Sequence, residues 1–410
     1  MSRVIPVLRL LPLIALPLVA ACGDVDDDPG APGARGPVAL TTWSDGEVAG
    51  DLPVYVADAD GALRGAYRSG DDGRLTVEVG DGGFVTVVDD RGGLRLVDTL
   101  GDVHPGDVLD LGRRRRGDGA RPRELAVAPL AAVPGASYAI EVCGPTITRT
   151  VVLEPGAALT AYYGGAALDD DGGALLIARA EGVAPARFAV IDADDVAALA
   201  APVEFGAWRQ TAAEARFFVA TPAGADEVEV AIRGPHGCTL GGGAGTGAEV
   251  VARFLPDQRP AAVTATAWYA PADGDDVGAD GTALVRRRFA GVDLDDGALD
   301  LSDPPARIDR VAVQVTPTAM EVTWRSTGDD LGDGVQLSIG VGADTRWTLL
   351  IPEGAPRLRL PEVPEVPPTT PTWVDVTRLD VDDVDGFAAL RARAGTALDA
   401  APGWSSTGRW

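Results

Sequence analysis

Apolar and polar residues alternate along most of the chain after residue 36, in short runs that turn residues separate. The segment Arg74–Val79 (RLTVEV) is the plainest case, because its apolar residues fall at every second position. A period of two is typical of a strand with one buried face in an antiparallel sheet. The Asp-Gly pairs at 60–61 and 72–73 supply tight turns between such runs. The pattern therefore predicts an all-β protein.

Similar runs recur to the end of the chain, and the last of them is Phe387–Arg393. Short strands spaced by roughly 8–12 residues indicate tandem antiparallel β-sandwich domains. One segment is predicted to be helical. Asp194 and Asp195 precede the Ala-rich run 196–201, and an aspartate is a good N-cap. Pro202 would end this helix within two turns.

Residues 37–112 carry a more specific order of strands and turns. Leu52–Val56 (LPVYV) is followed by the turn Asp58–Gly61 and later by Asp72–Val79 (DGRLTVEV). This order resembles that of carboxypeptidase regulatory-like (transthyretin-like) domains. The resemblance implies a β-sandwich of an accessory kind, and so it implies an architecture and no activity.

The rest of the chain divides less sharply. Residues 124–302 form a β-rich middle region, and the pattern is compatible with either one domain or two. Residues 303–410 start with Asp-Pro-Pro. They contain the predicted strand Met320–Trp324, which is followed by further alternating runs. This block resembles a fibronectin type III or immunoglobulin-like sandwich.

The N-terminus has the features of an export signal. Arg3 precedes the apolar run 10–21, which is shorter than the about 20 residues that span a membrane and fits a signal peptide. The sequence VAAC at 19–22 resembles the lipobox of bacterial lipoproteins. The resemblance implies that residues 1–21 are removed and that Cys22 is lipidated. The alternative is an ordinary secretory signal with a chance cysteine.

The sequence after Cys22 agrees with an anchored protein. Residues 22–36 are acidic and rich in glycine and proline, which is typical of a flexible tether. Gly23 follows the cysteine, and similarity to enterobacterial sorting rules implies the outer membrane of a Gram-negative bacterium. Residues 113–123 hold six arginines and predict a linker. The alternatives are a contact with anionic lipid or glycan and a protease-sensitive site.

The overall charge narrows the range of partners. The chain has 410 residues with 61 acids and 35 bases, for a net charge of −26. A field of this sign repels nucleic acids and anionic membrane surfaces. We therefore expect no nucleic-acid partner and expect attachment to the membrane only through the N-terminal lipid.

Two cysteines remain once Cys22 carries a lipid. Cys143 and Cys238 each follow a strand run and adjoin a Gly-Pro turn. Export permits a disulfide, and two thiols with no other partner tend to pair. The sequence therefore predicts a bond between them. The alternative is two separate buried thiols.

The chain offers little for catalysis or metal binding. Its two histidines, His104 and His236, complete no catalytic triad, and no zinc-protease or phosphate-loop motif is present. His236 and Cys238 are too few ligands for a structural zinc site. The acidic loops 58–61, 169–172, 273–276 and 380–386 could hold calcium but also match hairpin turns. No cofactor and no catalytic residue are predicted, and the metal content is left open.

Two hypotheses on function follow. The first is a non-enzymatic binding or structural role in the cell envelope, with an envelope protein or a glycan as partner. The second is a calcium-dependent glycan binder or a carbohydrate-active enzyme on the cell surface. An acidic cleft flanked by Trp208, Trp268 or Trp347 would favour the second hypothesis, and a featureless convex surface would favour the first.

Overall fold

The computed structural model describes most of the chain after residue 34. The described residues are 35–44, 47–90, 93–112, 123–144, 147–152, 159–163, 168, 172–183, 187–210, 213–234, 238–255, 260–269, 283–290, 297–304, 306–328, 332–354, 356–393 and 402–410. The predicted signal peptide, Cys22, the tether up to residue 34 and the arginines of 113–122 lie outside the described residues.

The described chain is almost entirely β, and the predicted all-β fold of antiparallel sandwiches is confirmed. Its elements are β1 (Gly36–Ser44), β2 (Glu47–Val48), β3 (Pro53–Ala57), β4 (Leu63–Arg68), β5 (Arg74–Val79), β6 (Gly83–Asp89), β7 (Arg95–Val103), β8 (Val108–Gly112), β9 (Arg123–Val127), β10 (Ser137–Cys143), β11 (Ile147–Val152), β12 (Leu159–Tyr163), β13 (Ala174–Glu181), β14 (Arg187–Ala193), η2 (Val196–Ala198), β15 (Arg209–Gln210), β16 (Ala213–Ala220), β17 (Glu227–Arg233), β18 (Thr239–Gly245), β19 (Glu249–Phe254), β20 (Ala262–Tyr269), β21 (Ala283–Ala290), β22 (Gly297–Asp300), β23 (Arg307–Thr316), β24 (Ala319–Thr327), β25 (Gly334–Val341), β26 (Thr345–Ile351), β27 (Arg357–Arg359), β28 (Trp373–Val381), α1 (Gly386–Ala392) and β29 (Gly403–Arg409).

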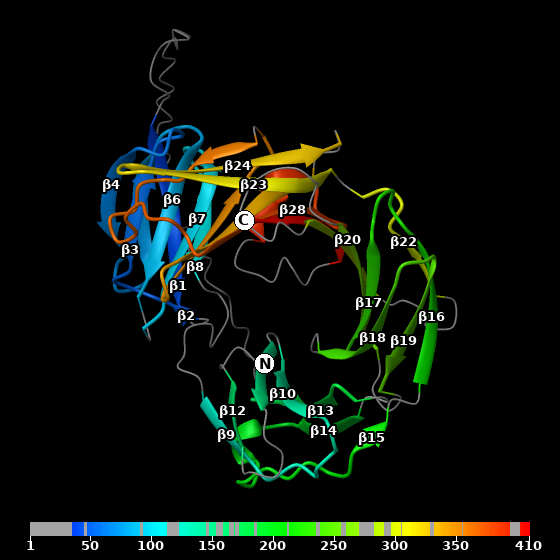
Figure 1. Cartoon of the computed structure of the whole chain (residues 1–410). Helices are drawn as coiled ribbons and strands as arrows, with labels where there is room; N and C mark the ends of the chain where they lie inside the picture. Colours follow the sequence, from blue (N-terminus) through cyan, green and yellow to red (C-terminus); the bar gives the residue numbers. More distant parts are fainter. Residues whose placement is uncertain are drawn as a thin grey trace, which may run out of the picture. The chain divides into compact units, whose positions relative to one another are not determined.

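One sheet runs through three of the regions distinguished in the sequence. Its order is β22-β16-β19-β18-β17-β20-β21-β29-β28-β25-β26-β7-β6-β3-β4. Most neighbours are antiparallel, and the hairpin turns between them follow the alternating runs. Smaller sheets cover parts of this large sheet, as the strands in Figure 1 show.

The first sandwich is built from residues 36–112. Strands β1, β5 and β8 form a small sheet, and the apolar face of this sheet packs against β3 and β6. Val38 and Val77 from the small sheet meet Val54 and Val85 in one buried cluster. The predicted one-sided burial of RLTVEV is confirmed, because Val77 and Val79 are buried while Glu78 is exposed.

The predicted C-terminal block forms a second sandwich that is continuous with the first. Strands β23, β24 and β27 form a separate sheet, and β23 packs against β28 and β29 (Figure 1). Strand β26 pairs in parallel with β7, with Trp347 opposite Val97. The sequence analysis separates 37–112 from 303–410, whereas in the structure strands of both ranges share one sheet and its buried clusters.

The middle region contains two packed groups of strands. In the first, the sheet β11-β10-β13-β14-β15 packs against the pair β12-β9, with Tyr138, Ile140 and Leu176 in its core. In the second, strands β16 to β22 surround a core that contains Phe217, Val230 and Leu240. Strand β21 pairs with β29, so the second group joins the C-terminal block through hydrogen-bonded backbone.

Two local predictions differ from the structure. The sequence predicts a strand over 387–393, but Gly386–Ala392 is the short helix α1. Leu390 is fully buried against the first sandwich, and this packing outweighs the weak alternation. The predicted helix at 196–201 is reduced to the 3₁₀ turn η2, in which Asp195 does cap the backbone N–H of Ala197.

Strand β18 was not anticipated. Its sequence TLGGGAG has almost no side chains from which a period could be recognised, and glycine is uncommon in strands. The close approach of neighbouring backbone explains why glycine occupies these positions of β18. A Cβ added at Gly242 would lie 2.5 Å from the carbonyl oxygen of Val230, and one at Gly243 would lie 2.1 Å from that of Val251.

Candidate ligand-binding cleft

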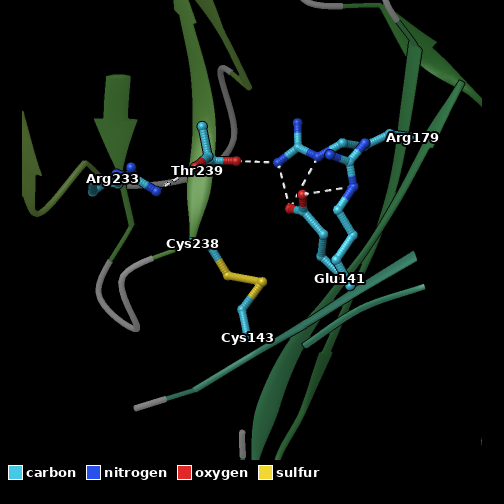
Figure 2. Close-up of a disulfide and its surroundings, with 7 residues drawn as sticks. Glu141, Cys143, Arg179, Arg233, Cys238 and Thr239 are labelled. Carbon is cyan, nitrogen blue, oxygen red and sulfur yellow. Dashed lines mark hydrogen bonds and ion pairs between the residues drawn. A yellow bond between two sulfur atoms is a disulfide. The ribbon is translucent and has the colours of Figure 1, made fainter. Parts of the chain in front are cut away.

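A disulfide fixes the place where the two groups of the middle region meet. Cys143 ends β10 and Cys238 directly precedes β18, and the structure bonds them with their Cα atoms 5.5 Å apart. This distance lies within the limit of about 7 Å that a disulfide requires. Both sulfur-bearing side chains are fully buried, beside Ile177 and Leu240. Figure 2 shows the bond between the two sets of strands.

A buried ion pair lies next to the disulfide. Arg179 of β13 donates from Nε and Nη2 to Glu141 Oε2 of β10, at 3.0 and 2.9 Å. The same guanidinium donates to the backbone carbonyl of Thr239, across the meeting point (Figure 2). It also lies 4.8 Å from the centre of the Phe188 ring. A guanidinium with these partners can be buried because its charge and its donors are both satisfied.

The cleft opens beside this contact. It has a volume of about 750 Å³ and lies between β13–β14 and the outward face of β17 to β20. Its lining residues are Arg179, Val183, Phe188, Glu227, Glu229, Ala231, Thr239, Gly241, Gly242, Gly243, Ala244, Arg253 and Trp268. A volume of this size is within the usual range of small-molecule sites.

The floor of the cleft is the glycine-rich strand β18. Gly242 lies opposite Ala231 on one neighbouring strand and opposite Arg253 on the other, so it shares their outward face. Ala244 is the next residue of β18 on this face and lies opposite Glu229. Because neither residue carries a large side chain, a trough remains between β17 and β19. The close backbone contacts that require glycine thus also produce the hollow.

One wall of the cleft combines acidic and aromatic side chains. Glu227 and Glu229 are two residues apart on β17, so both carboxylates project from the same face of the sheet. Trp268 of β20 lies directly opposite Glu227, and Trp268 is partly exposed. Within the described part of the chain, no ion pair or hydrogen bond engages the Glu227 carboxylate. The wall therefore presents carboxylate acceptors beside an aromatic face.

The other tryptophans considered from the sequence lie elsewhere. Trp208 stacks against Tyr138, with ring centres 5.8 Å apart, and donates to the carbonyl of Ala131 at 2.6 Å. Trp347 is buried and donates to Thr99 Oγ1 at 2.9 Å. Of the three, Trp268 lines the cleft, together with two glutamates and two arginines. The separation of Glu227 from Trp268 in sequence explains why the pair could not be predicted.

The acidic loop 58–61 has structural partners. Asp58 pairs with Arg64 and Arg35, and Asp60 accepts from the backbone N–H of Ala62 at 3.0 Å. The loops 169–171 and 273–276 and the residue His236 lie outside the described residues. Nowhere in the described ranges do three or more His, Cys, Asp or Glu side chains gather closely enough to hold a metal ion.

A second hollow of about 370 Å³ lies over the buried indole of Trp347. It is lined mostly by apolar side chains, among them Leu63, Met320 and the prolines of the segment Pro361–Pro368. The sequence predicts this proline-rich segment as an extended loop, and in the structure Val363 and Val366 pack inward from it. The hollow presents few polar groups that could orient a ligand.

Within the described segments, no helix combines the length and the apolar composition that a bilayer crossing requires.

Comparison with known proteins gives distant likenesses only. No family model and no curated protein matches the chain. Among solved structures, the Bacillus anthracis TIE protein is similar at 13% identity and a TM-score of 0.19, over 65% of this chain and 49% of the other. This chain thus spans about half the length of that protein. A tetra-tandem repeat in the extending region of a large adhesion protein is similar at 12% identity and a TM-score of 0.16, over 85% and 96%. TM-scores this low carry no argument about this chain.

Proposed function

We propose that this chain is a lipid-anchored protein of the bacterial cell envelope that binds a saccharide in the cleft above β18, without catalysing a reaction. The observation that supports the saccharide is the position of Trp268 beside Glu227 and Glu229, over a floor with almost no side chains. A partly exposed indole beside carboxylates is an arrangement that suits glycan recognition.

The chemistry of the wall suits a sugar ring. An indole offers a flat apolar face on which the C–H face of a pyranose can stack, and its edge stays polar. Carboxylates are pure acceptors, so Glu227 and Glu229 suit the hydroxyl groups of the same sugar. The trough along Gly242 and Ala244 leaves room for further sugar units.

The geometry favours binding over hydrolysis. Glycoside hydrolysis uses two carboxyl groups that flank the scissile bond from opposite sides. Glu227 and Glu229 instead project side by side from one strand. A sugar stacked on Trp268 would therefore meet both carboxylates along the same side.

The cleft is tested with short neutral and amino-sugar oligosaccharides, by titration of intrinsic fluorescence and by calorimetry. Trp268→Ala is expected to weaken binding about tenfold, as the loss of about 1.4 kcal/mol of contact would do. Trp208→Ala is the matched control, because this tryptophan packs against Tyr138 outside the cleft. Equal affinities of the two variants for every saccharide would contradict the proposal.

The anchor needs a separate test. The lipobox context of Cys22 supports lipidation, so Cys22→Ser is expected to move the protein from the detergent phase to the aqueous phase. Membrane fractionation of cells that express either form would then show which membrane holds the parent protein. A variant that still enters the detergent phase would contradict the proposed anchor and leave the cleft unaffected.

A further inference from the structure

A carboxylate and an aromatic ring lie next to each other in the cleft. Glu227 and Trp268 are opposite residues of the neighbouring antiparallel strands β17 and β20. Side chains of such a pair leave the same face of the sheet, with Cβ atoms about 4.5–5.5 Å apart. Glu227 is exposed and Trp268 is partly exposed, so a ligand can reach both. The carboxylate and the ring can therefore contact the same group of one ligand.

The two arginines that line the cleft have carboxylate partners of their own. Arg179 Nε donates to Glu141 Oε2 at 3.0 Å, and Arg253 Nε donates to Glu214 Oε1 at 3.0 Å. Among the residues that the structure describes, none donates to the Glu227 carboxylate or forms an ion pair with it. The negative charge of Glu227 is therefore left for a ligand.

The second carboxylate of the wall has positive charges nearer to it. Arg233 lies four residues after Glu229 on β17, and the charges of the two side chains interact. Arg286 of β21 lies in the same row of opposite residues as Glu229, two strands away. In the row of Glu227, the residue of β21 is Leu284 instead. The charge without an arginine beside it is therefore that of Glu227.

We propose that the saccharide bound in this cleft carries a free, protonated amine, which lies between the Glu227 carboxylate and the face of the Trp268 ring. A carboxylate attracts an ammonium group and accepts from its N–H donors. The face of an indole is the best aromatic surface for a cation. A hydroxyl or an acetylated amine would use the acceptor but not the charge. The inference rests on the proposed saccharide site and names the sugar class that it prefers, an unacetylated amino sugar.

The test compares an oligomer of glucosamine with the matching oligomer of N-acetylglucosamine, by calorimetry on the full chain at a pH where the amine is protonated. The two probes share the ring and the linkage and differ at the amine. The wild type is expected to bind the glucosamine oligomer about fivefold more tightly, which is the upper end for an exposed ion pair. In Glu227→Gln this preference should disappear, because the amide keeps the shape of the side chain but not its charge.

Glu78→Gln is the matched control. Glu78 is an exposed glutamate of β5, outside the lining of the cleft, and its replacement changes the net charge by the same amount. The preference for the amine should persist in this variant. The comparison separates the effect of one carboxylate from the general attraction of cations to a chain with a net charge of −26.

Three results would overturn the inference: equal binding of the two oligomers by the wild type, tighter binding of the acetylated oligomer, or an amine preference that is the same in Glu227→Gln and Glu78→Gln. In each case, weaker binding by Trp268→Ala would still support the saccharide site. If neither these oligomers nor neutral oligosaccharides bind, the saccharide site and the inference fail together. Glutamine at the exposed position 227 leaves the core unchanged, and equal urea midpoints of the variants and the wild type would verify this.

Discussion

Two joins within the molecule are made in different ways. Strands β7 and β26 join the first sandwich to the C-terminal one through a parallel ladder with apolar side chains on both faces. The two groups of the middle region share buried apolar side chains without a backbone ladder, and they are also joined by the Cys143–Cys238 disulfide and the hydrogen bond from Arg179 to the Thr239 carbonyl. Side chains fill the space where the two sandwiches meet. A cleft lies beside the place where the two groups of the middle region meet.

The difference follows from the side chains at each join. At the first, Phe84 and Val97 pack on one face of the large sheet and Leu100 and Leu350 on the other. Close packing of such side chains excludes a ligand. At the second, Ile177 and Phe188 also pack into the core of the second group, but the glycine-rich strand β18 beside them carries almost no side chains and leaves a trough. The cleft is thus explained by the missing side chains of β18.

The disulfide should carry the largest single effect. In the double variant Cys143→Ser and Cys238→Ser, the free energy of unfolding is expected to fall by about 2–5 kcal/mol, since a loop with a sequence separation of 95 is released. Urea denaturation measures the change, and labelling of the denatured, unreduced wild type should find neither thiol of this pair. An unchanged urea midpoint would show that the second join does not depend on its covalent bond.

Removing an apolar side chain where β7 and β26 meet should lower the free energy of unfolding. Leu350→Ala is expected to cost about 2–5 kcal/mol, because Leu350 is 5% exposed and lies in the core of the first sandwich. Unfolding of both sandwiches should remain one transition at a lower midpoint. Val251→Ala, at a side chain 41% exposed, is the control and should change stability by less than about 0.5 kcal/mol. Two separate transitions in the wild type would contradict a shared core.

A charged contact at the rim of the first sandwich should add a small pH dependence. The hydrogen bond to Asp81 raises the pKa of His104, and Asp102 acts in the same direction. The stabilisation is therefore complete below about pH 6.5 and is lost as the pH rises through the higher pKa of the folded state. The His104 side chain is 43% exposed, so we expect less than about 1 kcal/mol.

The His104 prediction is checked by NMR titration and by urea midpoints between pH 6 and 8. His104→Gln should remove this part of the pH dependence. A His104 pKa at or below that of a free histidine would refute the prediction.

The smallest effect concerns a tyrosine at the apolar join. Burial, followed by the hydrogen bond to Glu365, raises the pKa of Tyr55 to about 12. Ultraviolet titration should therefore detect Tyr55 among the tyrosines that ionise late, together with Tyr269, whose pKa is also raised by burial, and Tyr55→Phe should remove the Tyr55 component. In Glu365→Gln the pKa is expected to fall but to stay above the ordinary value, because the burial remains. Loss of the whole shift in Glu365→Gln would mean that burial has little part in it.

The sequence by itself determined most of the strands. The period of two in segments such as RLTVEV, with Asp-Gly at the turns, fixes which side chains face a core. The sequence also places Cys143 and Cys238 near the ends of strand runs and beside Gly-Pro turns, which predicts that they can pair. These features are local, and a short stretch of residues is enough to specify them.

Only the tertiary structure decided which strands meet. Alternation of apolar residues shows which face of a strand is buried, but it does not show which strand lies beside it. The pairings β7–β26 and β21–β29 could therefore not be inferred from the sequence. The TLGGGAG strand has no side-chain period, and it is ordered by the backbone of β17 and β19 on either side. The run 387–393 alternates weakly, and burial of Leu390 selects the helix. The cleft likewise arises from strand pairing, because Glu227, Gly242 and Trp268 become neighbours only when β17, β18 and β20 lie side by side.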